Sequence, residues 1–212
     1  MIKKVFNKFK NMFTGKSMMD NQFEFIMSVE GQISKLEAAK LIDLAANVPL
    51  DLSIVEIGTF RGKSAISLAY GSLLGNKNRV YAIDPHEKFI GVMGGVFGPK
   101  DQKELYANIV MAGVGEIVAV VSLPSAIASR AWAKRNIGLL WIDGDHSYEG
   151  VFSDYTNWLP FVVDGGVIAF HDNNSDGVAR LIQEIKSKGM LTLTEEIESI
   201  TCFKLERGKN DA

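Results

Sequence analysis

Helix and strand signals alternate along the chain from residue 32 onward, and this alternation restricts the fold more than any other feature of the sequence. Short apolar runs, typical of buried strands, are separated by longer segments whose apolar residues recur at helical spacing. Strands and helices that alternate in this way build a parallel sheet with helices on both faces. We therefore predict an α/β protein with a doubly wound sheet.

The bounds of the predicted elements follow from apolar periodicity and from residues that start or stop helices. We predict strands at residues 52–57, 79–83, 116–121, 137–142, 167–170, 191–195 and 200–205. We predict helices at residues 36–46, 63–74, 102–112, 125–134, 148–159 and 176–188. Ser34 and Glu37 form a capping box at the start of the first helix. Gly165 and Gly166 are expected to turn the chain into the fifth strand.

The length and charge of the chain limit its class. With 212 residues, 47% of them hydrophobic, the chain suits one domain with one sizeable core. The formal net charge of -2 provides no basic field for a nucleic-acid backbone, so we expect small molecules or proteins as partners. A lone cysteine, Cys202, and the lack of a signal peptide or a membrane-spanning apolar run predict a cytoplasmic protein.

Residues 1–31 are predicted to form an arm and a connector outside the domain, which spans residues 32–212. Four apolar residues share one face of a helix in this arm, with lysines mostly on the other faces: Ile2, Phe6, Phe9 and Phe13. We expect this helix to pack on its own domain or to join two copies in a homo-oligomer, and residues 17–27 to be a connector. A contact with a membrane surface is the alternative.

A glycine-containing turn, Glu56-Ile57-Gly58-Thr59-Phe60-Arg61-Gly62, follows the first predicted strand. Such a turn lets backbone N–H groups approach a ligand at the N-terminus of the next helix. A phosphate-binding P-loop needs one residue more between its two glycines than this chain has between Gly58 and Gly62. A dinucleotide-binding turn needs a middle glycine where this chain has Phe60. The turn therefore matches neither nucleotide-binding motif in full.

Polar side chains follow the later strands, at the edge of the sheet where ligands bind in folds of this class. Asp84 follows the second strand and is placed either to bind two ribose hydroxyls or to form an Asx turn. The glycine-rich segment 86–100 comes next, and we predict a mobile lid with Phe89, Met93 and Phe97 as substrate contacts.

The segment from Leu140 to Val151 reads Leu-Trp-Ile-Asp-Gly-Asp-His-Ser-Tyr-Glu-Gly-Val and belongs to an ordered series of motifs. The glycine turn, the acidic end of the second strand, this Asp-Gly-Asp-His turn and a Gly-Gly-strand-His-Asp segment follow one another between Val55 and Asp172. The chain thus resembles small class I S-adenosylmethionine-dependent methyltransferases. This group is similar to sugar O-methyltransferases and, more distantly, to catechol and caffeoyl-CoA O-methyltransferases.

The resemblance implies a Rossmann-like sheet of seven strands, mostly parallel with an antiparallel last strand, and S-adenosylmethionine as the methyl donor. This donor has no phosphate, so it requires neither nucleotide-binding motif. The turn, the strand ends and the resemblance together predict these donor-binding residues: Glu56, Gly58, Thr59, Phe60, Gly62, Ser64, Asp84, Ser122 and Asp143.

Asp143 and the run His171-Asp172-Asn173 end two strands that we expect to be neighbours, so their side chains can converge on one divalent cation. Magnesium is the expected metal. The resemblance implies one acid after the fourth strand and two consecutive ligands after the fifth. The sugar-type pattern maps these two onto His171 and Asp172, and the catechol-type pattern onto Asp172 and Asn173. A histidine ligand would also suit manganese, iron or zinc.

His146 lies three residues after Asp143, on the turn that follows the same strand. The resemblance implies that His146 is the general base that takes the proton of the substrate hydroxyl, with Asp143 beside it in the catalytic site. The alternative is that His146 caps the next helix. Asp145 could orient the imidazole or cap that helix.

The sequence analysis as a whole predicts a metal-assisted O-methyltransferase that acts on a small-molecule hydroxyl of a sugar, a phenol or a polyketide. One alternative is a module that binds S-adenosylmethionine without catalysis. The other is a P-loop-like nucleotide-binding protein.

Overall fold

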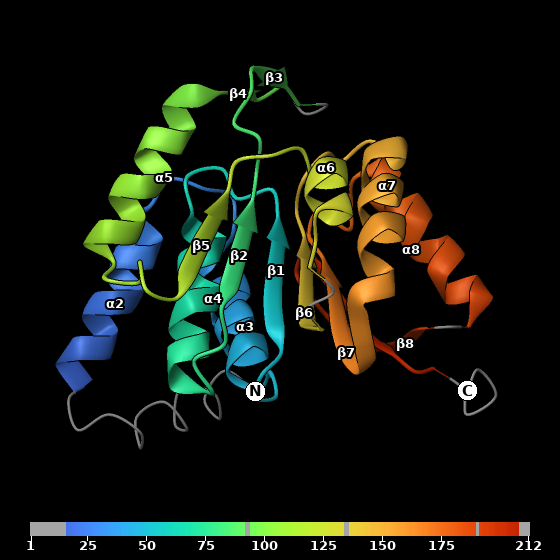
Figure 1. Ribbon diagram of the computed structural model, residues 1–212, viewed down its shortest axis with the longest axis horizontal. Coiled ribbons are helices and arrows are strands. Elements are labelled where there is room, and N and C mark those ends of the chain that lie inside the picture. Colours follow the sequence, from blue (N-terminus) through green and yellow to red (C-terminus); the bar gives the residue numbers. More distant parts are fainter. Residues whose placement is uncertain (1–15, 92–93, 134–135, 190, 208–212) are drawn as a thin grey trace.

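The computed structural model describes residues 16–91, 94–133, 136–189 and 191–207. Its centre is a seven-stranded sheet with the strand order β5-β2-β1-β6-β7-β9-β8 (Figure 1). The strands are β1 (Ser53–Ile57), β2 (Val80–Ile83), β5 (Val118–Val121), β6 (Ile137–Ile142), β7 (Val162–Phe170), β8 (Leu191–Ile197) and β9 (Ile200–Leu205). The first five run parallel, whereas β9 is antiparallel to both of its neighbours. The predicted sheet with an antiparallel last strand is confirmed.

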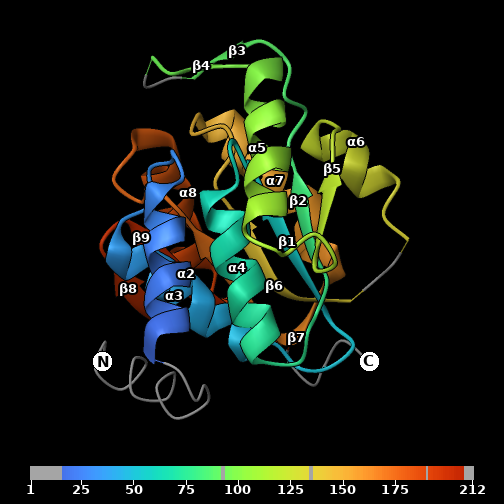
Figure 2. The same cartoon turned by 90° about the vertical axis from the view of Figure 1, so that its left-hand side faces the viewer.

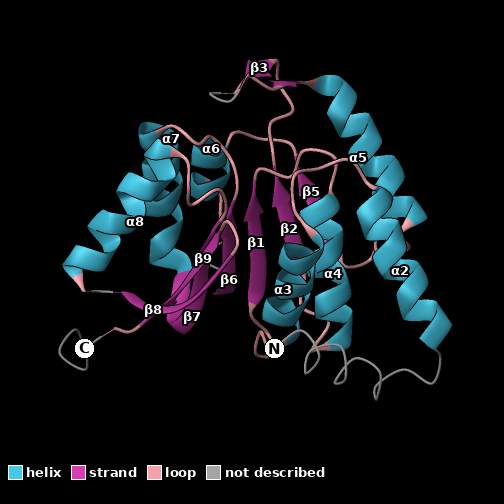
Figure 3. Ribbon diagram, turned by 180° about the vertical axis from the view of Figure 1, so that it is seen from behind, coloured by secondary structure: helices cyan, strands magenta, loops and turns pink. Residues whose placement is uncertain are grey.

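Helices cover both faces of the sheet (Figures 1 and 3). One face carries α2 (Lys16–Ser28), α3 (Lys35–Ala46), α4 (Lys63–Leu74) and α5 (Pro99–Met111). The other carries α6 (Ser125–Arg130), α7 (Tyr148–Trp158), the 3-10 helix η1 (Leu159–Phe161) and α8 (Asp176–Lys188). No helix of the described ranges is long and apolar enough to cross a membrane.

Two hydrophobic cores lie on the two faces because side chains alternate along each strand. In β6, Leu139 and Trp141 face the core under α3 and α4, whereas Leu140 and Ile142 face the core under α7 and α8. All six residues of β6 are buried, as are all five of β1. This double burial explains why the two strands are nearly continuous apolar runs in the sequence.

The order of the sheet reverses at β1. The chain moves outward from β1 to β2 and β5, and then returns to the other side of β1 as β6. Ligands bind at such a switch point, outside the carboxyl ends of the strands. The fold therefore places the ends of β1 and β6 at the expected binding edge.

Residues 17–27, predicted to be a connector, instead belong to helix α2. Ile26 is fully buried in the core next to α4, so tertiary packing stabilises a segment with a weak helical pattern of its own. The predicted amphipathic helix of the arm lies outside the described residues. The domain boundary at residue 32 stays a prediction.

The glycines before the fifth strand do not start it, as the sequence suggested, but lie within it. Strand β7 begins at Val162, which pairs with Ile137, and the register then shifts so that Leu139 pairs with Val167. The residues around Gly165 and Gly166 are thus accommodated as an irregularity of one long strand.

Two helices differ from their predicted bounds by more than one residue. Helix α5 begins at Pro99 rather than at residue 102, and proline suits this first helical position because it has no N–H to donate. Helix α6 ends at Arg130, earlier than predicted.

The segment 86–100, predicted to be a loop, contains the short strands β3 (Phe89–Ile90) and β4 (Val96–Phe97). These pair as an antiparallel hairpin that extends beyond the carboxyl edge of the sheet, at the top of α5 (Figure 2).

Candidate active site

Two glycines shape the turn that joins β1 to α4. Gly58 has a φ of +81°, and a Cβ atom there would lie 2.2 Å from the backbone oxygen of Asp143. Gly62 has a φ of +90°, and a Cβ atom there would lie 2.6 Å from a methyl group of Leu105. Residues with a side chain rarely adopt these φ values, and neither position has room for a Cβ atom. Gly58 therefore lets the turn lie against the residue that follows β6, and Gly62 lets it lie against α5.

Asp84 fixes this turn from the end of β2. Its Oδ2 atom accepts hydrogen bonds from the backbone N–H groups of Thr59 (3.1 Å) and Phe60 (3.0 Å). Its Oδ1 atom accepts one from the backbone N–H of His86 (2.9 Å), which is the Asx-type bond that the sequence left open. In this structure the carboxylate predicted to bind ribose thus holds the turn between β1 and α4 in place.

His86 strengthens the same connection. The backbone oxygen of Phe60 lies 3.0 Å from its Nε2 atom, and the backbone oxygen of Asp84 lies 3.1 Å from its Nδ1 atom. The side chain is buried. Phe60 and His86 both have positive φ values, +47° and +50°. Such strained backbone persists only where the surroundings hold it, and it is frequent at functional sites.

The other predicted donor-binding residues differ in how deeply they are buried. Glu56 in β1, Thr59 in the turn and Ser64 in α4 are buried. Burial raises the pKa of Glu56 to about 8, against the effect of the nearby hydroxyls of Ser64 and Thr59. Neither carboxyl oxygen of Glu56 has a hydrogen-bond partner among the described residues. Ser122 lies at the end of β5, and its hydroxyl accepts a hydrogen bond from Gln102 of α5 (2.6 Å).

Three predicted catalytic and metal residues converge beside the turn. One ligand atom from each of Asp143, His146 and Asp172 lies within 4.8 Å of the other two. The Nε2 atom of His146 is 3.1 Å from Asp172 Oδ2 and 3.5 Å from Asp143 Oδ1. The pairing of β6 with β7 causes this convergence, because Asp143 and Asp172 follow the ends of these adjacent parallel strands. We call these three residues the acid–histidine cluster.

The charges of the cluster perturb one another. Contacts with Asp143 and Asp172 raise the pKa of His146 to about 9, although partial burial opposes this. Contacts with His146 and His171 hold the pKa of Asp172 well below its usual range. Without a metal ion, the imidazole of His146 is therefore protonated at neutral pH.

Ser147, and not His146, caps the helix α7, and Asp145 supports this cap. Ser147 is the N-cap of α7, and its hydroxyl accepts a hydrogen bond from the N–H of Gly150 (3.1 Å). Asp145 accepts hydrogen bonds from the N–H (3.0 Å) and the hydroxyl (2.8 Å) of Ser147. Asp145 thus supports the cap, which leaves the ring of His146 to the cluster.

His171 lies behind the cluster rather than in it. Its Nδ1 atom is 3.0 Å from Asp143 Oδ1, and its Nε2 atom is 3.5 Å from Glu37 Oε2. Burial acts to lower the pKa of His171, but Asp143, Asp172 and Glu37 together raise it to about 12. Both ring nitrogens therefore face carboxylates: Nδ1 faces Asp143 and Asp172, and Nε2 faces Glu37.

The side chain of Asn173 is directed at β9. Its side-chain nitrogen donates a hydrogen bond to the hydroxyl of Thr201 in β9 (3.0 Å), and its backbone N–H donates one to the oxygen of Ser199 (3.0 Å). Of the metal ligands predicted from the sequence, the cluster thus contains Asp143 and Asp172, together with the predicted base.

Comparison with known proteins identifies the family. A family model described as a methyltransferase domain matches residues 55–173, more than half of the chain. The chain belongs to this methyltransferase family. The matched segment runs from β1 to the residue after Asp172, so it contains the turn and the whole cluster. The family and the fold that the resemblance implies are confirmed.

Solved structures of similar fold cover nearly all of the methyltransferase. Cofactor-bound Rv0187 from MTB is 18% identical, with 92% of each chain covered and a TM-score of 0.68. An O-methyltransferase from Bacillus cereus in complex with SAH is 19% identical, with 91% of this chain and 93% of that chain covered and a TM-score of 0.64. The O-methyltransferase TomG from Streptomyces achromogenes, in complex with SAM, is 16% identical, with 96% and 95% covered and a TM-score of 0.64.

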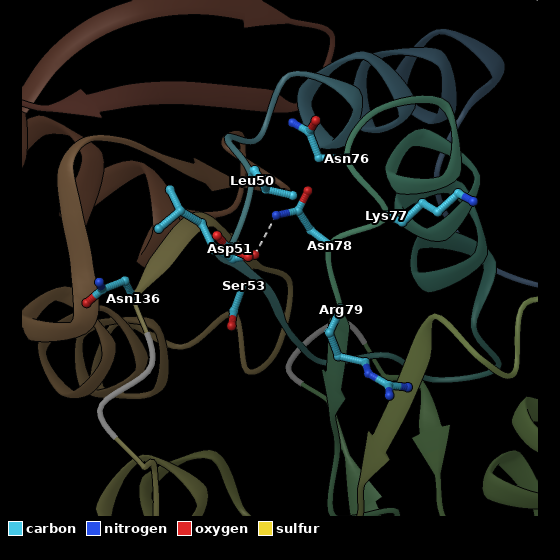
Figure 4. Close-up of a pocket in the computed structure, with 9 residues that line it drawn as sticks. Leu50, Asp51, Ser53, Asn76, Lys77, Asn78, Arg79 and Asn136 are labelled. Carbon is cyan, nitrogen blue, oxygen red and sulfur yellow. Dashed lines mark hydrogen bonds between the residues drawn. The ribbon is translucent and has the colours of Figure 1, made fainter.

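The methyltransferase also has a polar cavity of about 480 Å³ at the opposite end of the sheet, where β1 and β2 begin (Figure 4). It is lined by Leu50, Asp51, Leu52, Ser53, Asn76, Lys77, Asn78, Arg79 and Asn136. None of the predicted site residues lines this cavity. The cavity is therefore separate from the predicted site residues.

Sequence reasoning missed two residues of the site. His86 follows a strand end, like the other two histidines, but it was assigned to the lid segment as a whole. Glu37 was explained by its capping box, which the structure confirms. Glu37 left no further signal in the sequence, because its burial depends on packing against the β8–β9 turn.

Proposed function

We propose that this protein is an S-adenosylmethionine-dependent O-methyltransferase that methylates a small-molecule hydroxyl at the acid–histidine cluster. The observation that carries the proposal is the direct contact between the two parts of the site. Gly58 of the donor-binding turn lies against the backbone of Asp143, the first member of the cluster. A donor on this turn and an acceptor at the cluster are thereby neighbours, as methyl transfer requires.

The donor-binding part is formed by the turn from Gly58 to Gly62 and the end of β2. Names of similar structures support this choice of donor, because the Bacillus cereus protein holds SAH and TomG holds SAM. The N-terminus of α4 favours the carboxylate of the donor's methionine part. Asp84, with a partly exposed side chain, lies at the position expected for the ribose.

The residues of the cluster fit a divalent cation. The two carboxylates of the cluster are hard oxygen ligands within 4.8 Å of each other, and the imidazole beside them stays free to take a proton. Asp143 and Asp172 would hold the ion, and Mg²⁺ suits two carboxylates with open positions for water and substrate. When bound, such an ion would lower the pKa of an acceptor hydroxyl and offset the negative charge that keeps His146 protonated.

His146 serves as the proton acceptor in this proposal. The oxygen of the acceptor forms a bond to the methyl carbon, the bond from that carbon to sulfur breaks, and the electron pair goes to sulfur. The hydroxyl proton passes to Nε2 of His146, the atom that faces both carboxylates. Trp141 and the buried end of β6 exclude water from behind the cluster.

The acceptor is a small molecule in this proposal. A net charge of -2 favours no polyanion, and the β3–β4 hairpin extends over the carboxyl edge with exposed Phe89 and Val96. Phe97 of the hairpin contacts the ring of Phe60 in the donor-binding turn, with 5.3 Å between ring centroids. The hairpin is placed to cover an apolar part of a sugar, phenol or polyketide acceptor. The free, buried Cys202 suits a cytoplasmic protein.

The test is release of S-adenosylhomocysteine from a panel of such hydroxyl compounds with Mg²⁺. His146→Ala should lower kcat about 10²- to 10⁴-fold, and Asp172→Asn should lower it similarly, while calorimetry gives an unchanged donor affinity. Asp176→Asn, the same exchange in the first turn of α8, is the control and should stay within about threefold. Full turnover in His146→Ala and Asp172→Asn, with or without a chelator, would falsify the proposed chemistry.

Two other functions give different results in the same experiments. A non-catalytic module would bind S-adenosylmethionine but transfer no methyl group to any acceptor. A P-loop-like protein would bind ATP in preference to S-adenosylmethionine in calorimetry. The shortened spacing between Gly58 and Gly62 favours the methyl donor over ATP.

A further inference from the structure

We propose that Glu37 is a positioning residue of the methyltransferase site, which holds His171 and, through it, the carboxylate of Asp143. This inference rests on the proposed function of the acid–histidine cluster. Glu37 lies in the first turn of α3, before the segment that the family model matches. Its contribution would therefore come from outside the recognised methyltransferase motifs.

The carboxylate of Glu37 is fixed from two sides. Its Oε2 atom accepts a hydrogen bond from the backbone N–H of Ser34 (2.8 Å), within the capping box of α3. Its Oε1 atom accepts hydrogen bonds from the hydroxyl and the backbone N–H (3.0 Å) of Ser199, in the turn between β8 and β9. With its side chain 4% exposed, Glu37 has little freedom to turn away from His171.

His171 carries this constraint to the cluster. Its ring lies between Oε2 of Glu37 (3.5 Å from Nε2) and Oδ1 of Asp143 (3.0 Å from Nδ1), and Asp172 Oδ2 is 3.4 Å from Nδ1. The ring packs on Trp141, with 5.4 Å between centroids, and the backbone N–H of His171 donates to the oxygen of Ile142 (3.0 Å). Backbone and ring are thus both held, so the orientation of the ring sets where the two carboxylates lie.

A capping role alone does not explain this arrangement. A capping box needs a glutamate or glutamine to reach back to the N-cap N–H, and water can solvate its other oxygen. Here the acid is buried, and burial of a charge is costly unless it is paired. The charge of Glu37 is paired with the imidazole that contacts both cluster carboxylates. Residues behind metal-binding carboxylates orient them, and their loss typically lowers metal affinity or activity about 10- to 100-fold.

The test compares Glu37→Gln with Lys40→Gln. Glutamine preserves the capping box but removes the charge that faces His171. Lys40, also on α3, pairs with Glu195 of β8, so its substitution weakens the contact of α3 with the sheet without touching His171. For each variant we would measure Mn²⁺ affinity and donor affinity by calorimetry, kcat and KM with an acceptor, and the thermal midpoint.

Glu37→Gln should lower Mn²⁺ affinity and kcat about 10- to 100-fold, with donor affinity within about twofold and KM little changed. Lys40→Gln should keep kcat and Mn²⁺ affinity within about threefold. Unchanged kcat and Mn²⁺ affinity in Glu37→Gln would overturn the inference. So would equal losses in both variants that follow the thermal midpoint, because these indicate a structural role.

Failure of the proposed function would look different. If the wild-type protein bound no Mn²⁺, the metal part of that proposal would fail, and the kcat ratio of Glu37→Gln to wild type would decide the role of Glu37. If His146→Ala and Asp172→Asn kept full turnover while Glu37→Gln lost it, the cluster would not be the reacting site. The inference about Glu37 would then be overturned as well.

Discussion

The turn between β1 and α4 and the acid–histidine cluster are neighbours that are held in place by different physical means. The turn from Gly58 to Gly62 depends on backbone shape, with two glycines at positive φ and hydrogen bonds from backbone N–H groups to Asp84. The cluster depends on charge, because carboxylates and imidazoles from separate segments are brought within contact distance. Changes in the turn should therefore affect donor binding, whereas changes of charge in the cluster should affect turnover.

Gly58→Ala should give the largest effect. Its Cβ atom would lie 2.2 Å from the backbone oxygen of Asp143, so either the turn or the end of β6 must move. We expect donor binding to be lost and the thermal midpoint to fall by about 10 °C or more. Calorimetry and thermal unfolding would measure both.

Gly113→Ala is the matched control for Gly58→Ala. Gly113 also has a positive φ, +68°, but a Cβ atom there would meet nothing within 4 Å. The Gly113→Ala substitution should lower the free energy of unfolding by only about 1–2 kcal/mol, through backbone strain, and leave donor binding intact. Equal behaviour of the two variants would show that strain, and not the close approach to Asp143, limits the turn.

Asp84→Asn should give the next largest effect. This substitution removes the negative charge that accepts hydrogen bonds from the turn. Asparagine cannot accept all three backbone hydrogen bonds that the carboxylate accepts from Thr59, Phe60 and His86. We expect donor affinity to fall about 10-fold or more, as the loss of charge-assisted hydrogen bonds implies. At saturating donor, kcat should remain within about threefold. A fall in kcat with unchanged donor affinity would contradict the separation of the two regions.

Glu56→Gln should change the dependence of stability on pH by a few kcal/mol. Burial raises the pKa of Glu56 to about 8 from an ordinary value of 4.5, so the folded state binds this proton more tightly than the unfolded state. The wild-type protein should therefore lose stability as the pH rises from 4.5 through 8. Glu56→Gln removes this loss, so the advantage of the variant in thermal midpoint should be larger at pH 9 than at pH 5. An advantage independent of pH would contradict the burial of an ionisable Glu56.

The metal-free cluster should show a smaller pH effect, on the order of 1–2 kcal/mol. The pKa of His146 is raised from 6.5 to about 9, so its contribution to stability is complete below 6.5 and is lost as the pH rises through 9. Thermal unfolding in the presence of a chelator would measure this loss. Asp172→Asn should flatten it, because Asp172 is one of the two carboxylates that raise the pKa. An equal loss of stability with pH in the wild type and in Asp172→Asn would contradict the statement that Asp172 raises the pKa of His146.

Sequence patterns predicted the bounds of helices and strands well where the residues of one element alone decide them. Helices α4 and α8 match their predicted bounds, and the capping box of Ser34 and Glu37 forms as expected. The predictions were wrong where contacts with a neighbouring element decide the secondary structure. Helix α2 owes its stability to the burial of Ile26, and β7 absorbs its glycines because β6 offers pairing partners on both sides of them.

The sequence by itself determined which residues gather at the site. Polar residues that follow parallel strands must meet at one edge of the sheet, so Asp84, Asp143 and Asp172 could be assigned to that edge before any coordinates. The spacing of Gly58 and Gly62 also excluded a full nucleotide-binding motif. Such features depend only on local order along the chain.

Only the tertiary structure decided which way each of these side chains faces. The sequence assigned Asp172 but could not choose between His171 and Asn173 beside it, because one backbone rotation, the φ of +49° at Asp172, changes the direction of consecutive side chains. The packing of α3 against the β8–β9 turn then places Glu37 behind His171, far from it in the sequence. Long-range packing and charge pairing set these directions, and neither leaves a local pattern in the chain.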